Sequence, residues 1–113
     1  MEVGRTKENG AYYDLAQVKE LVSVGRYVMW GRPTSFILNH YGAPASATLE
    51  KIIETMEDRD FTSSVELIKI PGTMADEYMV SYDDIDWYVK LFIDSDDGVG
   101  VQILSCSWDG VTH

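Results

Sequence analysis

Apolar residues in the first half of the chain recur with the period of amphipathic helices. Between Leu15 and Val22 they return every three to four positions, with Asp14 before them as a helix cap and Gly25 after them as a stop. The same period predicts two further helices, over residues 35–42 and 46–56. Between the first two helices, residues 27–30 form a short extended piece, which Gly31-Arg32-Pro33 is expected to end.

After Asp58 the apolar pattern changes from a period of 3.6 to a period of two, which is typical of strands. Strands are expected over residues 61–70, 77–82, 87–93 and 99–106. A turn over residues 94–98 joins the last two strands. Helices followed by strands predict an α+β fold, in which about three helices before residue 58 pack on one face of a four-stranded antiparallel sheet.

The length of 113 residues suits one domain. Residues 1–12 are polar and contain glycine, so they are expected to form a flexible lead-in to a single domain over residues 13–113. Aromatic residues make up 12% of the chain, which argues against intrinsic disorder. No apolar run is long enough to span a membrane and no apolar signal core begins the chain, so we expect a cytoplasmic protein without membrane contact.

The net charge of −10 is concentrated in the second half of the chain. Residues 1–57 contain seven acids and six bases, a net −1, whereas residues 58–113 contain twelve acids and three bases, a net −9. Such acidity disfavours direct nucleic-acid binding, which depends on neutralising phosphates. Two explanations remain open: an acidic surface that only keeps the protein soluble, or a surface that attracts a basic partner.

The residues that most often carry catalysis are scarce. His40 is expected to pack or cap near a helix end, and His113 is the last residue. No Ser-His-Asp or Cys-His set is apparent, and Cys106 is expected to be a small core residue. With no ligand-spaced partner for this cysteine, we expect neither a metal site nor a cofactor.

Two acidic clusters could in principle form a calcium site or an acid–base pair. Asp94, Asp96 and Asp97 resemble part of a calcium loop, but Gly98 is at the fifth position instead of the sixth, so a hairpin turn is the better interpretation. Asp83, Asp84 and Asp86 lie at a strand junction. Two close carboxylates can act as general acid and base, although a solvated turn is the simpler explanation of this spacing.

Several segments together resemble MqsR-type toxins of bacterial toxin–antitoxin pairs. Residues 13–26 (YDLAQVKELVSVGR) resemble the opening helix of that family, with its I/V-K-x-L-V-x-x-G-R run. Residues 49–61 resemble its third helix and D-F-Y segment, residues 87–91 its Y-V/L-K strand, and residues 102–106 its closing V-I-V-S-F strand. In collinear order the resemblance covers roughly residues 13–107. It implies a RelE-like α+β fold, an mRNA-cleaving activity and a cognate antitoxin.

The catalytic positions that the resemblance implies are mostly replaced. Ser63 and Ser107 stand where the family has lysines, its tryptophan–glutamine pair is missing, and residues 76–78 occupy that region. Only Tyr88 is retained, with Lys90 two residues further on the same strand face. RNA cleavage through a 2′-hydroxyl needs a base, a cation at the phosphate and an acid for the leaving oxygen, so the loss of both lysines argues against it.

The sequence therefore supports two functional hypotheses. The first is a non-enzymatic acidic binding protein on an MqsR-like scaffold: an inhibitor or nucleic-acid mimic that occupies the basic groove of nucleic-acid-handling machinery, as a phage anti-CRISPR protein does to a CRISPR effector. The residues expected to contact this partner are Asp83, Asp84, Asp86, Asp94, Asp96 and Asp97, with Tyr82 and Trp108 as aromatic anchors. The alternative is an mRNA interferase with Tyr88 and Lys90 as its catalytic residues.

Overall fold

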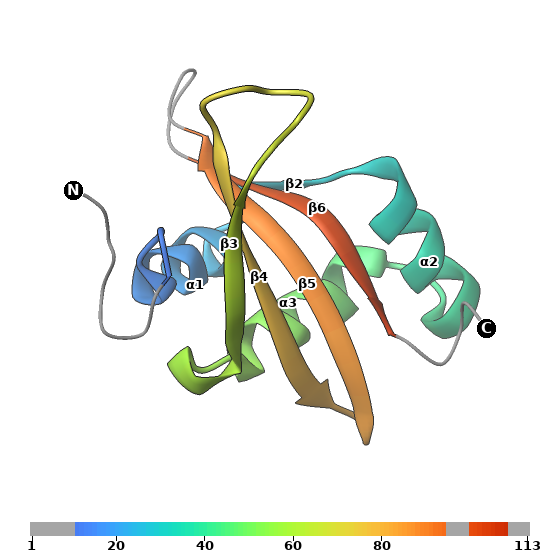
Figure 1. Cartoon of the computed structure of the whole chain (residues 1–113). Coiled ribbons are helices and arrows are strands. Elements are labelled where there is room, and N and C mark those ends of the chain that lie inside the picture. The colour runs from blue at the N-terminus through green and yellow to red at the C-terminus, as the bar shows by residue number, and fades with distance from the viewer. Residues whose placement is uncertain (1–10, 95–99, 109–113) are drawn as a thin grey trace.

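The computed structural model describes residues 11–94 and 100–108 (Figure 1). The helices are α1 (Leu15–Ser23), α2 (Gly31–Tyr41) and α3 (Ala45–Thr55), followed by the short 3₁₀ helix η1 (Asp58–Asp60). The strands are β2 (Tyr27–Met29), β3 (Phe61–Glu66), β4 (Met74–Tyr82), β5 (Ile85–Asp94) and β6 (Gly100–Trp108). The α+β class and the order of helices before the main strands are thus confirmed.

The sheet has five strands in the order β2-β6-β5-β4-β3, and it is mixed. Strands β3 to β6 pair antiparallel, as predicted. The prediction of a four-stranded, purely antiparallel sheet was wrong, because β2 pairs parallel with β6, with Tyr27 opposite Val101. A strand of three residues is too short for apolar alternation to show, and its partner lies far along the chain.

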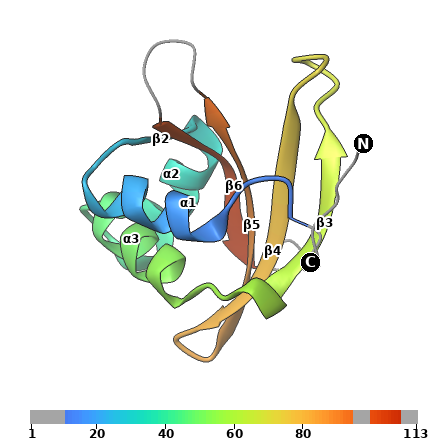
Figure 2. The same cartoon turned by 90° about the vertical axis from the view of Figure 1, so that its left-hand side faces the viewer.

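All three helices cover the same face of the sheet (Figure 2). No helix of the described residues covers the other face, which we call the open face. The core lies between these layers. Its largest fully buried side chains are Trp87, Tyr78, Ile37, Leu49, Ile52, Ile53, Met56, Leu91, Ile103, Val18, Val80 and Val89. Cys106 is also buried, as expected for a core residue, and burial raises the pKa of its thiol to about 12.

Helix α2 begins four residues earlier than the predicted start at Ser35. The extended piece does end before Gly31-Arg32-Pro33, as predicted, and these three residues form the first helical turn. Pro33 is accommodated there because the N–H groups of a first turn have no partner within the helix. The predicted end is confirmed, since Gly42 has a φ of 83°, a left-handed conformation that glycine adopts without strain.

Asp76 ties the start of the described chain to the sheet. Its buried carboxylate accepts the backbone N–H of Tyr12 at 3.0 Å and of Tyr13 at 2.8 Å, together with the hydroxyl of Ser64. Buried carboxylates need such donors to offset their lost hydration. Residues 11 and 12, expected to belong to the lead-in, therefore contribute to the folded domain, whereas residues 1–10 lie outside the described part.

Candidate functional site

The acidic residues Asp83, Asp84 and Asp86 lie at the tight turn that joins β4 to β5. Asp83 and Asp84 have φ angles of 58° and 60°, as in the two-residue turns that match the twist of antiparallel strands. Tyr82 and Ile85 are paired on either side of them, which closes the hairpin. All three aspartates are exposed, so the turn presents three carboxylates to solvent on a backbone of fixed geometry.

The turn is linked to the end of helix α2. The hydroxyl of Tyr41 donates to Asp83 Oδ2 at 2.9 Å, and the Tyr41 ring lies 5.8 Å from the ring of Trp87. Desolvation, followed by this hydrogen bond, raises the pKa of Tyr41 to about 12. Because Tyr41 is still 37% exposed, its ring and the carboxylates form one continuous surface.

The two aromatic residues predicted as anchors are packed within the protein. Trp108 is half-buried, with ring centroids 4.7 Å from Phe36, 4.6 Å from His40 and 4.9 Å from Trp87. Tyr82 is also half-buried and packs against the core. His40 does pack near the helix end, as expected, and stacks on Phe36. Among these aromatics, the more exposed Tyr41, which sequence analysis did not single out, is better placed to touch a partner.

The structure describes little of the second predicted acidic turn. Asp94 is the last residue of β5, and Asp96 and Asp97 lie outside the described residues. Their place in a partner-binding surface remains a prediction.

The open face of the sheet carries a polar row across the three strands β3, β4 and β5, which we call the Glu77 cluster: Ser63, Glu77, Tyr88 and Lys90. The register places Ser63 opposite Glu77, Glu77 opposite Lys90, and Lys90 opposite Ser105. Ser63 Oγ donates to Glu77 Oε1 and Tyr88 Oη donates to Glu77 Oε2, both at 2.6 Å. Lys90 Nζ lies 3.9 Å from Glu77 Oε2. The Glu77 carboxylate therefore contacts the other three residues of the cluster.

The protonation of this cluster follows from its contacts. Burial opposes the charged form of Glu77, but the hydrogen bonds from Ser63 and Tyr88 and the Lys90 ammonium outweigh it, so the pKa of Glu77 is lowered. Burial and the bond to Glu77 raise the pKa of Tyr88. At neutral pH Glu77 is thus a carboxylate and Tyr88 a neutral phenol, with the Lys90 side chain beside them. Such a set can accept a proton, donate one and stabilise a negative charge, but its cation is already paired.

Sequence analysis identified Tyr88 and Lys90 and missed Glu77 as their common partner. The signal was present, because consecutive residues of a strand point to opposite faces. Asp76 and Glu77 therefore cannot serve the same site. Asp76 is buried towards the helices and Glu77 lies on the open face, with its side chain 17% exposed. Only the register of the sheet shows which of the two meets Lys90.

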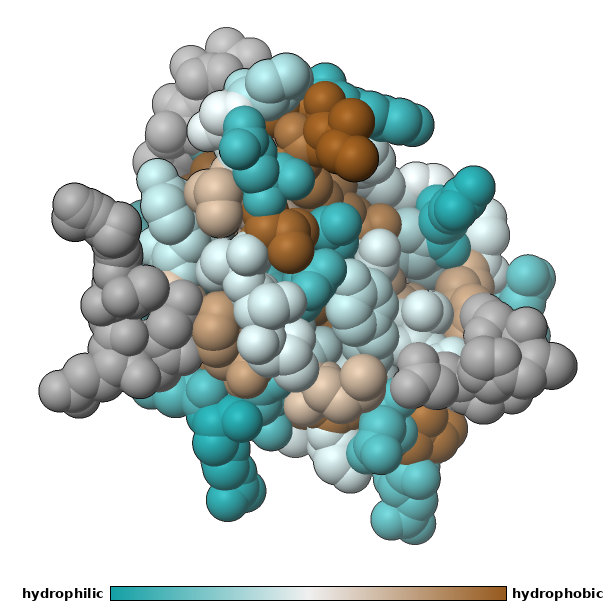
Figure 3. Space-filling model, in the orientation of Figure 1, coloured by the Kyte–Doolittle hydropathy of each residue, from teal (hydrophilic) through white to brown (hydrophobic). Residues whose placement is uncertain are grey.

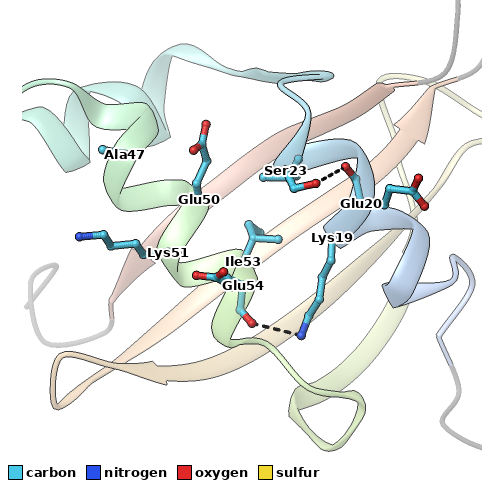
Figure 4. A pocket seen from close by; sticks show the side chains of 9 residues that line it. Lys19, Glu20, Ser23, Ala47, Glu50, Lys51, Ile53 and Glu54 are labelled. Carbon is cyan, nitrogen blue, oxygen red and sulfur yellow. Dashed lines mark hydrogen bonds between the residues drawn. The ribbon is translucent and has the colours of Figure 1, made fainter.

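A groove of about 650 Å³ lies on the helical side, between α1 and α3 (Figure 4). Buried Val22 and Ile53 lie at its base, and Glu20, Glu50, Glu54, Lys19 and Lys51 are among the residues that line it. Lys19 Nζ donates to the backbone oxygen of Glu54 at 3.2 Å, which ties the two helices together. Both acidic and basic side chains line the groove, so it does not present a surface of one sign of charge.

Within residues 11–94 and 100–108, no group of three or more His, Cys, Asp or Glu side chains is arranged to hold a metal ion. No helix in this part of the chain is long and apolar enough to cross a membrane. No family model, curated protein or solved structure matches this chain. The resemblance to MqsR-type toxins therefore stays a prediction that rests on short motifs, and function has to be argued from the surfaces themselves.

Proposed function

We propose that this chain is a non-enzymatic acidic binding protein whose partner is a basic, nucleic-acid-handling protein such as a CRISPR effector. The observation that carries the proposal is the β4–β5 turn, with three exposed carboxylates on a fixed hairpin. No Lys or Arg occurs in residues 70–89, which include this turn, or in residues 33–50, which include most of α2. The surface therefore has one sign of charge, as a mimic of phosphates requires.

The geometry of the turn favours binding over simple solvation. Tyr41 holds Asp83 in place, and the positive φ angles are set by the hairpin, so Asp83 and the backbone of the turn have little conformational entropy to lose when a partner binds. A field of one sign accelerates encounter with a basic surface and disfavours acidic competitors. The half-buried aromatic residues beneath the turn give it a rigid base.

The Glu77 cluster supports a second candidate function, an mRNA interferase that a cognate antitoxin would neutralise. Glu77 would accept the proton of the 2′-hydroxyl, Lys90 would stabilise the phosphate, and Tyr88 would protonate the leaving oxygen. The carboxylate beside Lys90 weighs against this function, because it cancels the only Lys or Arg charge in the cluster and repels phosphate. We therefore rank it second.

The test begins with capture of the partner from a host lysate and continues with binding kinetics at several salt concentrations. Replacement of Asp83, Asp84 and Asp86 by Asn is expected to slow association and to make the association rate less dependent on salt. Charges at the rim of an interface act mainly on the association rate. A second set replaces Asp94, Asp96 and Asp97.

The matched control replaces Glu20, Glu50 and Glu54 by Gln, which removes the same charge from the α1–α3 groove. If this control slows association as much as the turn variants do, only the overall charge matters. If both turn sets bind with an unchanged salt slope, the acidity serves solubility and the proposal is wrong.

A further inference from the structure

Strand β3 forms one edge of the sheet, and within the described chain no strand pairs with its outer side. The sequence predicted a strand to Ile70, but β3 ends at Glu66. The chain turns there, since the N–H of Leu67 bonds to the carbonyl of Thr73, and that of Thr73 bonds to Ile70. The turn leaves Ile68 93% exposed, and Figure 3 shows hydrophobic side chains around this loop, which extends beyond the sheet in Figure 1.

The register shows which backbone groups of β3 face outwards. The bond from Leu67 to Thr73 makes these two residues a hydrogen-bonded pair, and such pairs alternate along an antiparallel ladder. Val65 and Ser63 therefore bond towards β4. Ser64 and Glu66 direct their N–H and C=O groups away from it, two residues apart, with the spacing that an added strand needs.

Within the described residues, most of this edge lacks the usual protection against strand addition. Natural sheets protect their edges with Lys, Pro, β-bulges or very short strands. β3 has six residues without Lys or Pro, and its register shift lies between Phe61 and Ser63, so the pairing from Ser63 to Glu66 is regular. The opposite edge, β2, has only three residues and is protected by its length. Among the described strands, β3 thus offers the longer unprotected edge (Figure 2).

The charge around this edge indicates what would bind there. Residues 57–66 contain four acids and one base, a net −3. The base, Arg59, is 2.8 Å from the carboxylate of Glu57, so it is engaged within the same segment. An extended segment with basic side chains complements these acids, and an apolar side chain at its end would cover Ile68.

We propose that the β3 edge receives an extended, basic segment of the partner by strand addition, which would extend the sheet to six strands. Backbone hydrogen bonds from Ser64 and Glu66 hold the segment, and the flanking acids select its charge. The inference rests on the proposed function only in that the partner is basic. It adds a second surface, distinct from the β4–β5 turn.

The test uses the full chain and a capped ten-residue peptide of alternating Lys and Val as the probe. Nuclear magnetic resonance should show the amides of Ser64 and Glu66 shifting and their hydrogen exchange slowing when the peptide is added. Glu66→Pro removes one outward N–H and no ladder bond to β4, and should weaken binding roughly tenfold. It also removes the carboxylate that accepts the N–H of Gly72 at 2.9 Å, which is why a second version of the probe is needed. Glu66→Gln, the matched control for charge, should weaken binding only about twofold.

Glu66→Pro could also lose binding because it misfolds, so a second version of the probe is tested on the unchanged protein. Methylation of alternate peptide nitrogens blocks the bonding edge of the peptide and should abolish binding to the unchanged protein. Equal binding of Glu66→Pro and Glu66→Gln, or undiminished binding of the methylated peptide, would overturn the inference. Shifts confined to residues 83–86 would also overturn it, and would leave the proposed function intact. The opposite outcome is also distinguishable. If Glu66→Pro loses the peptide while the Asn variants of Asp83, Asp84 and Asp86 bind the partner unchanged, the inference is supported and the result counts against the proposed function.

Discussion

The hydroxyl of Tyr41 donates a hydrogen bond to the carboxylate of Asp83 and so joins the end of helix α2 to the β4–β5 turn. The two residues are far apart in sequence, and each is exposed at its own element. The bond turns a hairpin tip into part of a surface shared by a helix and two strands. Beyond the effect of burial, this bond raises the pKa of the Tyr41 hydroxyl, so that pKa can be used to detect whether the bond is present.

Replacement of Asp83 by Asn should lower the pKa of Tyr41 from about 12 towards 10, because the bond to a charged acceptor is lost while burial remains. The native protein loses the stability that this bond contributes as pH rises from 10 through 12, since the raised pKa favours the neutral phenol. Carbon-13 resonances of the Tyr41 ring measure the titration. Asp84→Asn is the control and should leave the pKa unchanged; an unchanged pKa in Asp83→Asn would contradict the prediction.

Asp76→Asn should cost about 3 kcal/mol of unfolding free energy, because a buried amide cannot satisfy the donors of Tyr12, Tyr13 and Ser64 together. Urea unfolding followed by circular dichroism gives the loss. Ser64→Ala, which removes one of these bonds, should cost about 1 kcal/mol. Equal losses in the two variants would show that Asp76 does not anchor the chain before α1.

The contribution of Glu77 to stability should depend on pH with a defined sign. Its pKa lies below the ordinary value of 4.5 in the folded protein, so the carboxylate stabilises the fold above pH 4.5 and this stabilisation disappears as pH falls through the lowered pKa. Glu77→Gln should therefore be less stable than the native chain by about 1 kcal/mol at pH 7, and no less stable in strong acid. Urea midpoints at both pH values measure this. A difference that does not change with pH would exclude the assigned ionisation.

Purified protein should cleave mRNA slowly or not at all, with or without ribosomes, because Glu77 pairs with Lys90. The resemblance to MqsR-type toxins, if it holds, adds that Ser63 and Ser107 stand where that family has lysines. Gel analysis of RNA products provides the measurement. Turnover that Tyr88→Phe and Glu77→Gln both abolish would reverse the ranking of the two proposed functions.

The apolar periods alone determined most of the elements. The stop at Gly25, the end of α2 at Gly42 and the strands after residue 58 follow from local chemistry, since amphipathic spacing and left-handed glycine act over a few neighbouring residues. The charge asymmetry and the acidic turn at residues 83–86 were likewise visible in the sequence.

The tertiary structure alone decided what depends on register. The extended piece predicted over residues 27–30 joins the sheet as β2 because β6 pairs with it, and β3 stops at Glu66 because Thr73 returns to bond with Leu67. Asp76 and Glu77 are neighbours in sequence, yet one anchors the chain before α1 and the other joins Tyr88 on the open face. Such contacts join residues that are distant in sequence, and a side chain's neighbours across a sheet are set by strand order and pairing, which no local pattern encodes.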